Sequence, residues 1–122
     1  MKVVFFSDSD YNFSAKLAKI CDLQSEELFF LNDFYSLSNI KDKKDILVAI
    51  DFNDYKNDLD SSINLIKSIA KFPTCLLLDK MESKIQKRAT SIGFDIVMTK
   101  TTFLMNFKTI KNQINNNPTN YQ

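Results

Sequence analysis

Five short apolar runs, separated by segments with helical spacing, constrain the fold of this chain more than any other feature of its sequence. Four of the runs are strongly apolar, and a weaker one lies between the first and the second of these. The runs are Val3–Phe6, Leu28–Leu31, Ile46–Ile50, Cys75–Leu78 and Ile96–Met98. Runs that are apolar on both faces are typical of strands buried in a parallel sheet.

The segments between the runs carry apolar residues at the spacing of amphipathic helices. Phe13, Leu17 and Ile20 form the first such stripe. Three later stripes consist of Leu59, Ile63, Ile66 and Ala70, of Ile85, Ala89 and Ile92, and of Phe103, Phe107, Ile110 and Ile114. The segment 33–40 is ambiguous and permits a short helix through Phe34, Leu37 and Ile40.

Strands alternating with helices predict an α/β fold with right-handed crossovers and helices on both faces of the sheet. We therefore expect a three-layer, doubly wound domain around a five-stranded parallel sheet, spanning residues 1–114. Four phenylalanines in the strands, Phe5, Phe6, Phe29 and Phe30, are expected to pack in its core. Residues 115–122 are polar, rich in asparagine and contain Pro118, which predicts a frayed tail.

Composition excludes several classes of function. The 122 residues include no histidine and a single glycine, Gly93, so histidine-dependent catalysis, P-loops and dinucleotide fingerprints are absent. The net charge of +1 favours neither nucleic acid nor a membrane as partner. Cys21 and Cys75 each lie in an apolar stretch and are expected to be buried, reduced thiols. No signal peptide or membrane-length apolar run is evident, so we expect a cytoplasmic protein.

Polar residues with a capacity for chemistry follow four of the five predicted strands. Because ligand sites in such sheets lie beyond the carboxyl ends of the strands, these residues are expected to converge. They are Ser7, Asp8 and Asp10, then Asp51, Asn53 and Asp54, then Asp79, and finally Lys100. Carboxylates suit Mg²⁺, and an ammonium group neutralises phosphoryl oxygens. The alternative is that the acids merely end strands and cap helices.

Three segments resemble the response-regulator receiver domains of bacteria. Lys2-Val-Val-Phe-Phe-Ser-Asp8 resembles the family's first strand, and Asp45-Ile-Leu-Val-Ala-Ile-Asp51 its third. Gly93-Phe-Asp-Ile-Val-Met-Thr-Lys100 is similar to the family's Gly-Ala-Asp-Asp-Tyr-Leu-Thr-Lys-Pro segment. The resemblance implies a flavodoxin-like receiver topology in which Asp51 accepts a phosphoryl group that Lys100 contacts. It also implies that Asp8, Asp51 and the backbone carbonyl of Asn53 are the ligands of Mg²⁺.

The sequence departs from the receiver pattern at three positions that belong to one mechanism. Ser7 stands where the family has a second acid, which predicts weak or absent Mg²⁺ binding. Leu78, or Asp79 in a register shifted by one, replaces a threonine or serine whose hydroxyl responds to the phosphoryl group, and neither can donate a hydrogen bond to it at neutral pH. Val97 replaces the family's switching aromatic. These changes predict a divergent or pseudo-receiver.

The resemblance also implies a surface for partner docking, and it leaves three functions to compare. The docking residues would be Lys84, Lys87, Arg88, Thr99, Leu104 and Lys108. Our first hypothesis is a non-enzymatic module, monomeric or weakly dimeric, that binds a regulatory protein such as a histidine kinase or a motility or chemotaxis component. The second is a phosphorylation-competent response regulator that catalyses, at most, its own phosphorylation and dephosphorylation at Asp51. The third is a flavodoxin-like module for a small ligand.

Overall fold

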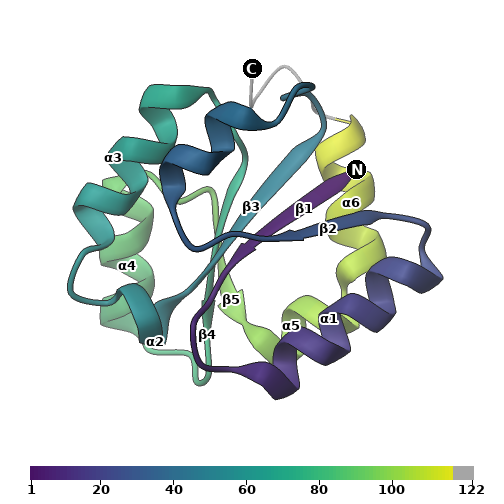
Figure 1. Ribbon diagram of the computed structural model, residues 1–122. Coiled ribbons are helices and arrows are strands. Elements are labelled where there is room, and N and C mark those ends of the chain that lie inside the picture. Colours follow the sequence, from purple (N-terminus) through teal and green to yellow (C-terminus); the bar gives the residue numbers. More distant parts are fainter. Residues whose placement is uncertain (117–122) are drawn as a thin grey trace.

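The computed structural model describes residues 1–116 and contains one five-stranded sheet in which all strands are parallel. The strand order is β2-β1-β3-β4-β5, so the chain crosses over the sheet in both directions from β1 (Figure 1). The strands are β1 (Lys2–Phe6), β2 (Glu27–Phe30), β3 (Ile46–Asp51), β4 (Thr74–Leu78) and β5 (Ile96–Thr99). All five lie on the apolar runs, and the predicted doubly wound sheet is confirmed.

Helices cover both faces of the sheet and form the outer two layers. On one face lie α1 (Tyr11–Leu23), α5 (Lys100–Met105) and α6 (Phe107–Asn116). On the other lie the 3₁₀ helix η1 (Phe34–Asn39), α2 (Phe52–Tyr55), α3 (Leu59–Ile69) and α4 (Ser83–Ile92). None of the helices within residues 1–116 has the length and apolarity needed to cross a membrane.

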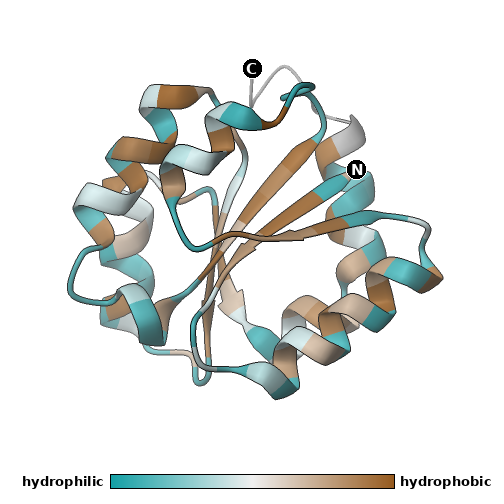
Figure 2. Cartoon of the chain, viewed as in Figure 1, coloured by the Kyte–Doolittle hydropathy of each residue, from teal (hydrophilic) through white to brown (hydrophobic). Residues whose placement is uncertain are grey.

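Alternation of side chains along the strands divides the core between the two faces. Successive strand residues point to opposite sides, so Val4 and Phe6 join one cluster while Val3 and Phe5 join the other. Figure 2 shows the apolar strands in the centre and polar residues on the outer sides of the helices. Cys21 and Cys75 are buried free thiols, as predicted. Burial raises the pKa of the Cys21 thiol to about 11.

Phe30 departs from its predicted place in the core, because its side chain is 52% exposed. The sheet order explains the difference, since β2 is an edge strand with β1 as its single neighbour. Phe30 packs edge-on against Phe5, with ring centroids 6.3 Å apart, and its outer side faces solvent. Phe29 is half-buried, whereas Phe5 and Phe6 are fully buried as expected.

Two helical segments differ in detail from the sequence prediction. The ambiguous segment 33–40 forms the 3₁₀ helix η1, in which Asp33 caps the backbone N–H of Tyr35. The stripe from Phe103 to Ile114 is buried throughout, but Asn106 divides it between α5 and α6. Helix α6 continues to Asn116, inside the predicted tail 115–122, and the rest of that tail lies outside the described residues.

Gly93 supplies the backbone geometry that ends α4 and begins the return to the sheet. Its φ of 121° lies in the left-handed region that residues with a side chain rarely adopt. The N–H of Gly93 donates to Thr90, and that of Phe94 donates to Ala89. This turn places Phe94 in the core beneath α4, directly before β5.

Candidate functional site

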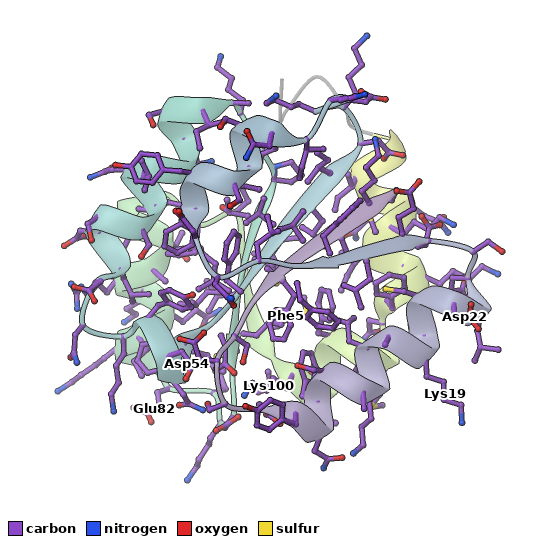
Figure 3. The ribbon with its side chains drawn as sticks, viewed as in Figure 1. Phe5, Lys19, Asp22, Asp54, Glu82 and Lys100 are labelled. Atoms are coloured by element: carbon purple, nitrogen blue, oxygen red, sulfur yellow. The ribbon has the colours of Figure 1, made fainter. Side chains whose placement is uncertain are left out.

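Lys100 lies at the centre of an ion-pair network at the carboxyl ends of the strands. It is the first residue of α5, and its side chain is 8% exposed. Its Nζ lies 2.8 Å from Asp10 Oδ2, 2.9 Å from Asp51 Oδ2 and 2.9 Å from Asp79 Oδ1. Figure 3 labels Lys100 at this end of the sheet, where Asp54 of α2 also lies. Four segments that are distant in sequence therefore meet at one ammonium group.

The charge of Lys100 is strongly favoured in this setting. Burial by itself lowers the pKa of the ammonium, but hydrogen bonds to Asp10, Asp79 and Asp51 outweigh burial and hold that pKa above its ordinary value. The ring of Phe13 adds a contact, with its centroid 5.8 Å from Nζ. Lys100 is consequently charged at any physiological pH.

Asp51 is the last residue of β3, and its side chain is fully buried. Oδ1 accepts the backbone N–H of Asn53 at 3.0 Å, which starts the short helix α2. Oδ2 accepts the hydroxyl of Ser7 at 3.0 Å and also faces Lys100. Both oxygens of the predicted phosphoacceptor are thus engaged by groups of the protein itself.

Asp10 connects α1 to the site through its two carboxylate oxygens. Its Oδ1 accepts the backbone N–H of Phe13 at 2.9 Å, which caps the N-terminus of α1. Its Oδ2 pairs with Lys100, and this hydrogen bond, followed by the one from Phe13, lowers the pKa of the carboxyl group. The acid therefore serves as a helix cap and as a partner of Lys100.

Asp79 is the first residue after β4, and both of its oxygens are used. Oδ1 pairs with Lys100, and Oδ2 accepts a hydrogen bond from the side-chain amide of Asn53. The hydrogen bond to Lys100 and then that to Asn53 lower the pKa of the Asp79 carboxyl group. The side chain nevertheless remains 60% exposed, unlike that of Asp51.

Asp54, one of the acids expected to converge at this end of the sheet, accepts hydrogen bonds from the loop that follows β1. Its Oδ2 accepts the hydroxyl of Ser7 at 3.0 Å and the backbone N–H of Asp8 at 2.8 Å. Its Oδ1 accepts the hydroxyl of Ser9 at 2.8 Å. Burial alone would raise the pKa of Asp54, but these donors lower it below the ordinary value. The position of Asp54 after a buried strand predicts its place at this end of the sheet, and not its bonds to Ser7, Asp8 and Ser9.

The residues that the resemblance implies as Mg²⁺ ligands, Asp8, Asp51 and Asn53, lie at the same end of the sheet. Asp8 is exposed, and the carboxylate of Asp51 is engaged by Lys100. Within residues 1–116 no group of three or more histidine, cysteine or acidic side chains is placed to hold a metal ion. Mg²⁺ is usually held by one or two carboxylates together with water, so at Asp51 it would compete with the ammonium of Lys100.

Two of the departures from the receiver pattern lie in the core. Leu78 is 1% exposed and belongs to the cluster under α3 and α4. Val97 is half-buried and packs against that same cluster. Both positions fill space between the sheet and α4, and neither provides a polar group to the site.

The six residues proposed for partner docking lie around β5, which is the second edge of the sheet. Lys84, Lys87 and Arg88 are exposed on α4, and Lys108 is exposed on α6. Arg88 is directed toward α3, where it pairs with Asp60 at 3.3 Å. Leu104 packs against the cluster on the opposite face, and Thr99 caps the N–H of Thr102. The group therefore flanks the edge strand from both faces of the sheet.

Comparison with known proteins decides the fold. No protein-family model matches the sequence, and no curated protein matches it. A response regulator in red light signaling of R. palustris superposes with a TM-score of 0.64 and 15% identity, over 89% of this chain and 90% of that one. The chain has the receiver fold.

Two further solved structures with the receiver fold agree. A response regulator receiver domain from Rhodospirillum rubrum has a TM-score of 0.63 at 19% identity, over 93% of this chain and 90% of that one. A response regulator CheY-like protein from Mesorhizobium loti has a TM-score of 0.62 at 16% identity, over 90% and 97% of the two chains. The predicted receiver topology is confirmed over most of the chain. The sequence identities to these structures are low, so the likeness shows the fold alone.

Proposed function

We propose that this chain is a receiver-type signalling domain that acts by protein–protein contact without phosphorylation of Asp51. The observation that carries the proposal is the state of that carboxylate. It is fully buried, and its oxygens are engaged by Lys100, by the hydroxyl of Ser7 and by the N–H of Asn53. A carboxylate that attacks phosphorus must present a free oxygen in line with the leaving group.

Electrostatics support the same conclusion. Phosphoryl transfer to a carboxylate brings negative charge to the site, which cations must neutralise. The single ammonium of Lys100 is shared by three carboxylates, and Asp54 adds a fourth nearby. The site therefore has an excess of negative charge before any phosphoryl group arrives.

The proposed partner is a regulatory protein that binds beside β5. Lys84, Lys87 and Lys108 give this edge positive charge, and Leu104 adds apolar surface. A mixed basic and apolar surface fits an acidic amphipathic helix. A histidine kinase or a motility or chemotaxis component in the cytoplasm would be such a partner, with the chain a monomer or weak dimer.

A phosphorylation-competent response regulator is the second candidate. The pairing of Lys100 with Asp51 at 2.9 Å favours it, because an acceptor carboxylate and a phosphoryl-binding lysine must be this close. In that case Mg²⁺ and the phosphoryl group would have to displace Asp79 and Ser7 from their present partners. The domain would then also catalyse its own dephosphorylation.

A small phosphodonor separates the two candidates. We expect that incubation with acetyl phosphate and Mg²⁺ leaves the mass of the intact protein unchanged. The matched control is Asp51→Asn, which removes the acceptor oxygen and alters the side chain least. Gain of one phosphoryl group by the native chain but not by Asp51→Asn would overturn the proposal and establish the second candidate.

A further inference from the structure

The connection between β4 and α4 is attached to the site through one side chain. It consists of Asp79, Lys80, Met81 and Glu82, and all four residues are exposed. Of these four, Asp79 is the one whose side chain has a hydrogen bond or ion pair to another described residue. Glu82 occupies the N-cap position of α4 without a side-chain capping bond.

The attachment by Asp79 reaches two other elements at once. Lys100 holds one of its oxygens from the start of α5, and Asn53 holds the other from α2. Both contacts involve side chains, so neither depends on the regular hydrogen bonding of the sheet. The carboxylate therefore links the segments that follow β3, β4 and β5, just beyond the last paired residues of these neighbouring strands.

The three carboxylates around Lys100 are not equally fixed. Asp51 is buried at the end of a central strand, and Asp10 is held as the cap of α1. Asp79 is 60% exposed and stands on a short connection, so solvent and ions reach it most easily. Of the three acids, it is the one that can leave Lys100 with the least disturbance to the core.

We propose that Asp79 is an internal latch that holds the β4–α4 connection on Lys100 and so fixes the start of α4. The latch rests on the proposed function, since it describes how the site is regulated when Asp51 is not phosphorylated. In the receiver domains that this sequence resembles, the hydroxyl of a threonine or serine in this connection moves toward the phosphoryl group. Here a carboxylate of the protein occupies Lys100 from the same connection.

The latch bears on partner binding through the position of α4. Lys84 and Lys87 follow the connection within the first turns of that helix. The inner side of α4 stays packed through Ala89 and the half-buried Ile85 and Ile92. Release of Asp79 would therefore loosen the connection and the first turn of α4 while the rest of the helix stays in place.

Amide hydrogen exchange in the full chain tests the latch, with Asp79→Ala compared with Glu82→Gln. Glu82 is a matched control, because it is an acid in the same connection that has no side-chain capping bond. We expect Asp79→Ala to speed exchange of the Gln86 amide, which donates to the carbonyl of Glu82 in the first turn of α4, by about threefold to tenfold, since one exposed ion pair and one hydrogen bond are lost. The side-chain amide of Asn53 should shift in the NMR spectrum as well. Glu82→Gln should leave both unchanged.

Unchanged exchange and an unchanged Asn53 amide in Asp79→Ala would overturn the latch. Asp79→Asn keeps the size of the side chain and removes its charge, and it gives the same readout if Asp79→Ala folds poorly. These measurements use neither Mg²⁺ nor a phosphodonor, so the latch can fail while Asp51 remains unmodified. Conversely, phosphorylation of Asp51 by acetyl phosphate would refute the proposed function whatever the exchange shows.

Discussion

Asp51 and Lys100 are a buried ion pair, and such a pair is stable only when its remaining hydrogen-bonding capacity is satisfied. In this protein Ser7 and the N–H of Asn53 complete the shell of Asp51, and Asp10 and Asp79 complete that of Lys100. No buried side-chain polar atom in the described part of the chain lacks a partner. We therefore expect the network to stabilise the folded state, whatever part it plays in function.

Loss of one partner of this pair is expected to cost more than loss of both. Lys100→Met leaves the buried carboxylate of Asp51 without its cation, and we expect the free energy of unfolding to fall by about 3 kcal/mol. Adding Asp51→Asn should restore a large part of that loss, because the uncompensated charge is removed. Urea unfolding of the four proteins in the cycle measures both effects. Equal stability of Lys100→Met and the native chain would contradict the pairing.

At the residue scale, the sequence predicted the positions of the site better than its contacts. Asp51 and Lys100 were found because they directly follow buried strands. The role of Asp54 was not foreseen, since its three donors come from a loop more than forty positions away. The bridge from Asp79 to Asn53 likewise depends on side-chain conformations that strand order alone does not determine.

At the element scale, the ends of helices and the edges of the sheet decide where local patterns fail. Phe30 has the same apolar neighbours in sequence as a core residue, yet it lies on an edge strand and is exposed. The helical stripe from Phe103 to Ile114 predicted the buried face correctly, but it did not predict the break at Asn106. Periodicity reports which face is buried, and it reports neither strand order nor small breaks in a helix.

Gly93 allows a prediction about how α4 ends. A Cβ at this position would lie 3.5 Å from Ile63 Cγ1, which is an ordinary contact, so the cost of Gly93→Ala comes from the backbone. Because φ is 121°, we expect a loss of about 1 kcal/mol or more in the free energy of unfolding. Lys84→Ala, an exposed change in the same helix, is the control and should be nearly neutral. A neutral Gly93→Ala would show that the turn does not need a left-handed residue.

At the scale of the whole molecule, the order of strands and helices was predictable from the sequence because each apolar run is short and each crossover is helical or nearly so. The right-handed crossover rule then leaves few topologies, and the receiver fold is one of them. What the sequence left open is whether the site accepts a phosphoryl group. The contacts of Asp51 support our proposal that it does not, and they form only where the segments after four strands meet.

The most direct test of this account is a series of amide NMR spectra of the whole chain. Spectra are recorded alone, with millimolar Mg²⁺, and with Mg²⁺ and beryllofluoride, and a receiver known to respond serves as the positive control. We predict no change at Asp8, Asp51 or Lys100, because the carboxylate of Asp51 stays with its internal partners. Shifts at these residues that disappear in Asp51→Asn would contradict the central claim and establish a working phosphoacceptor.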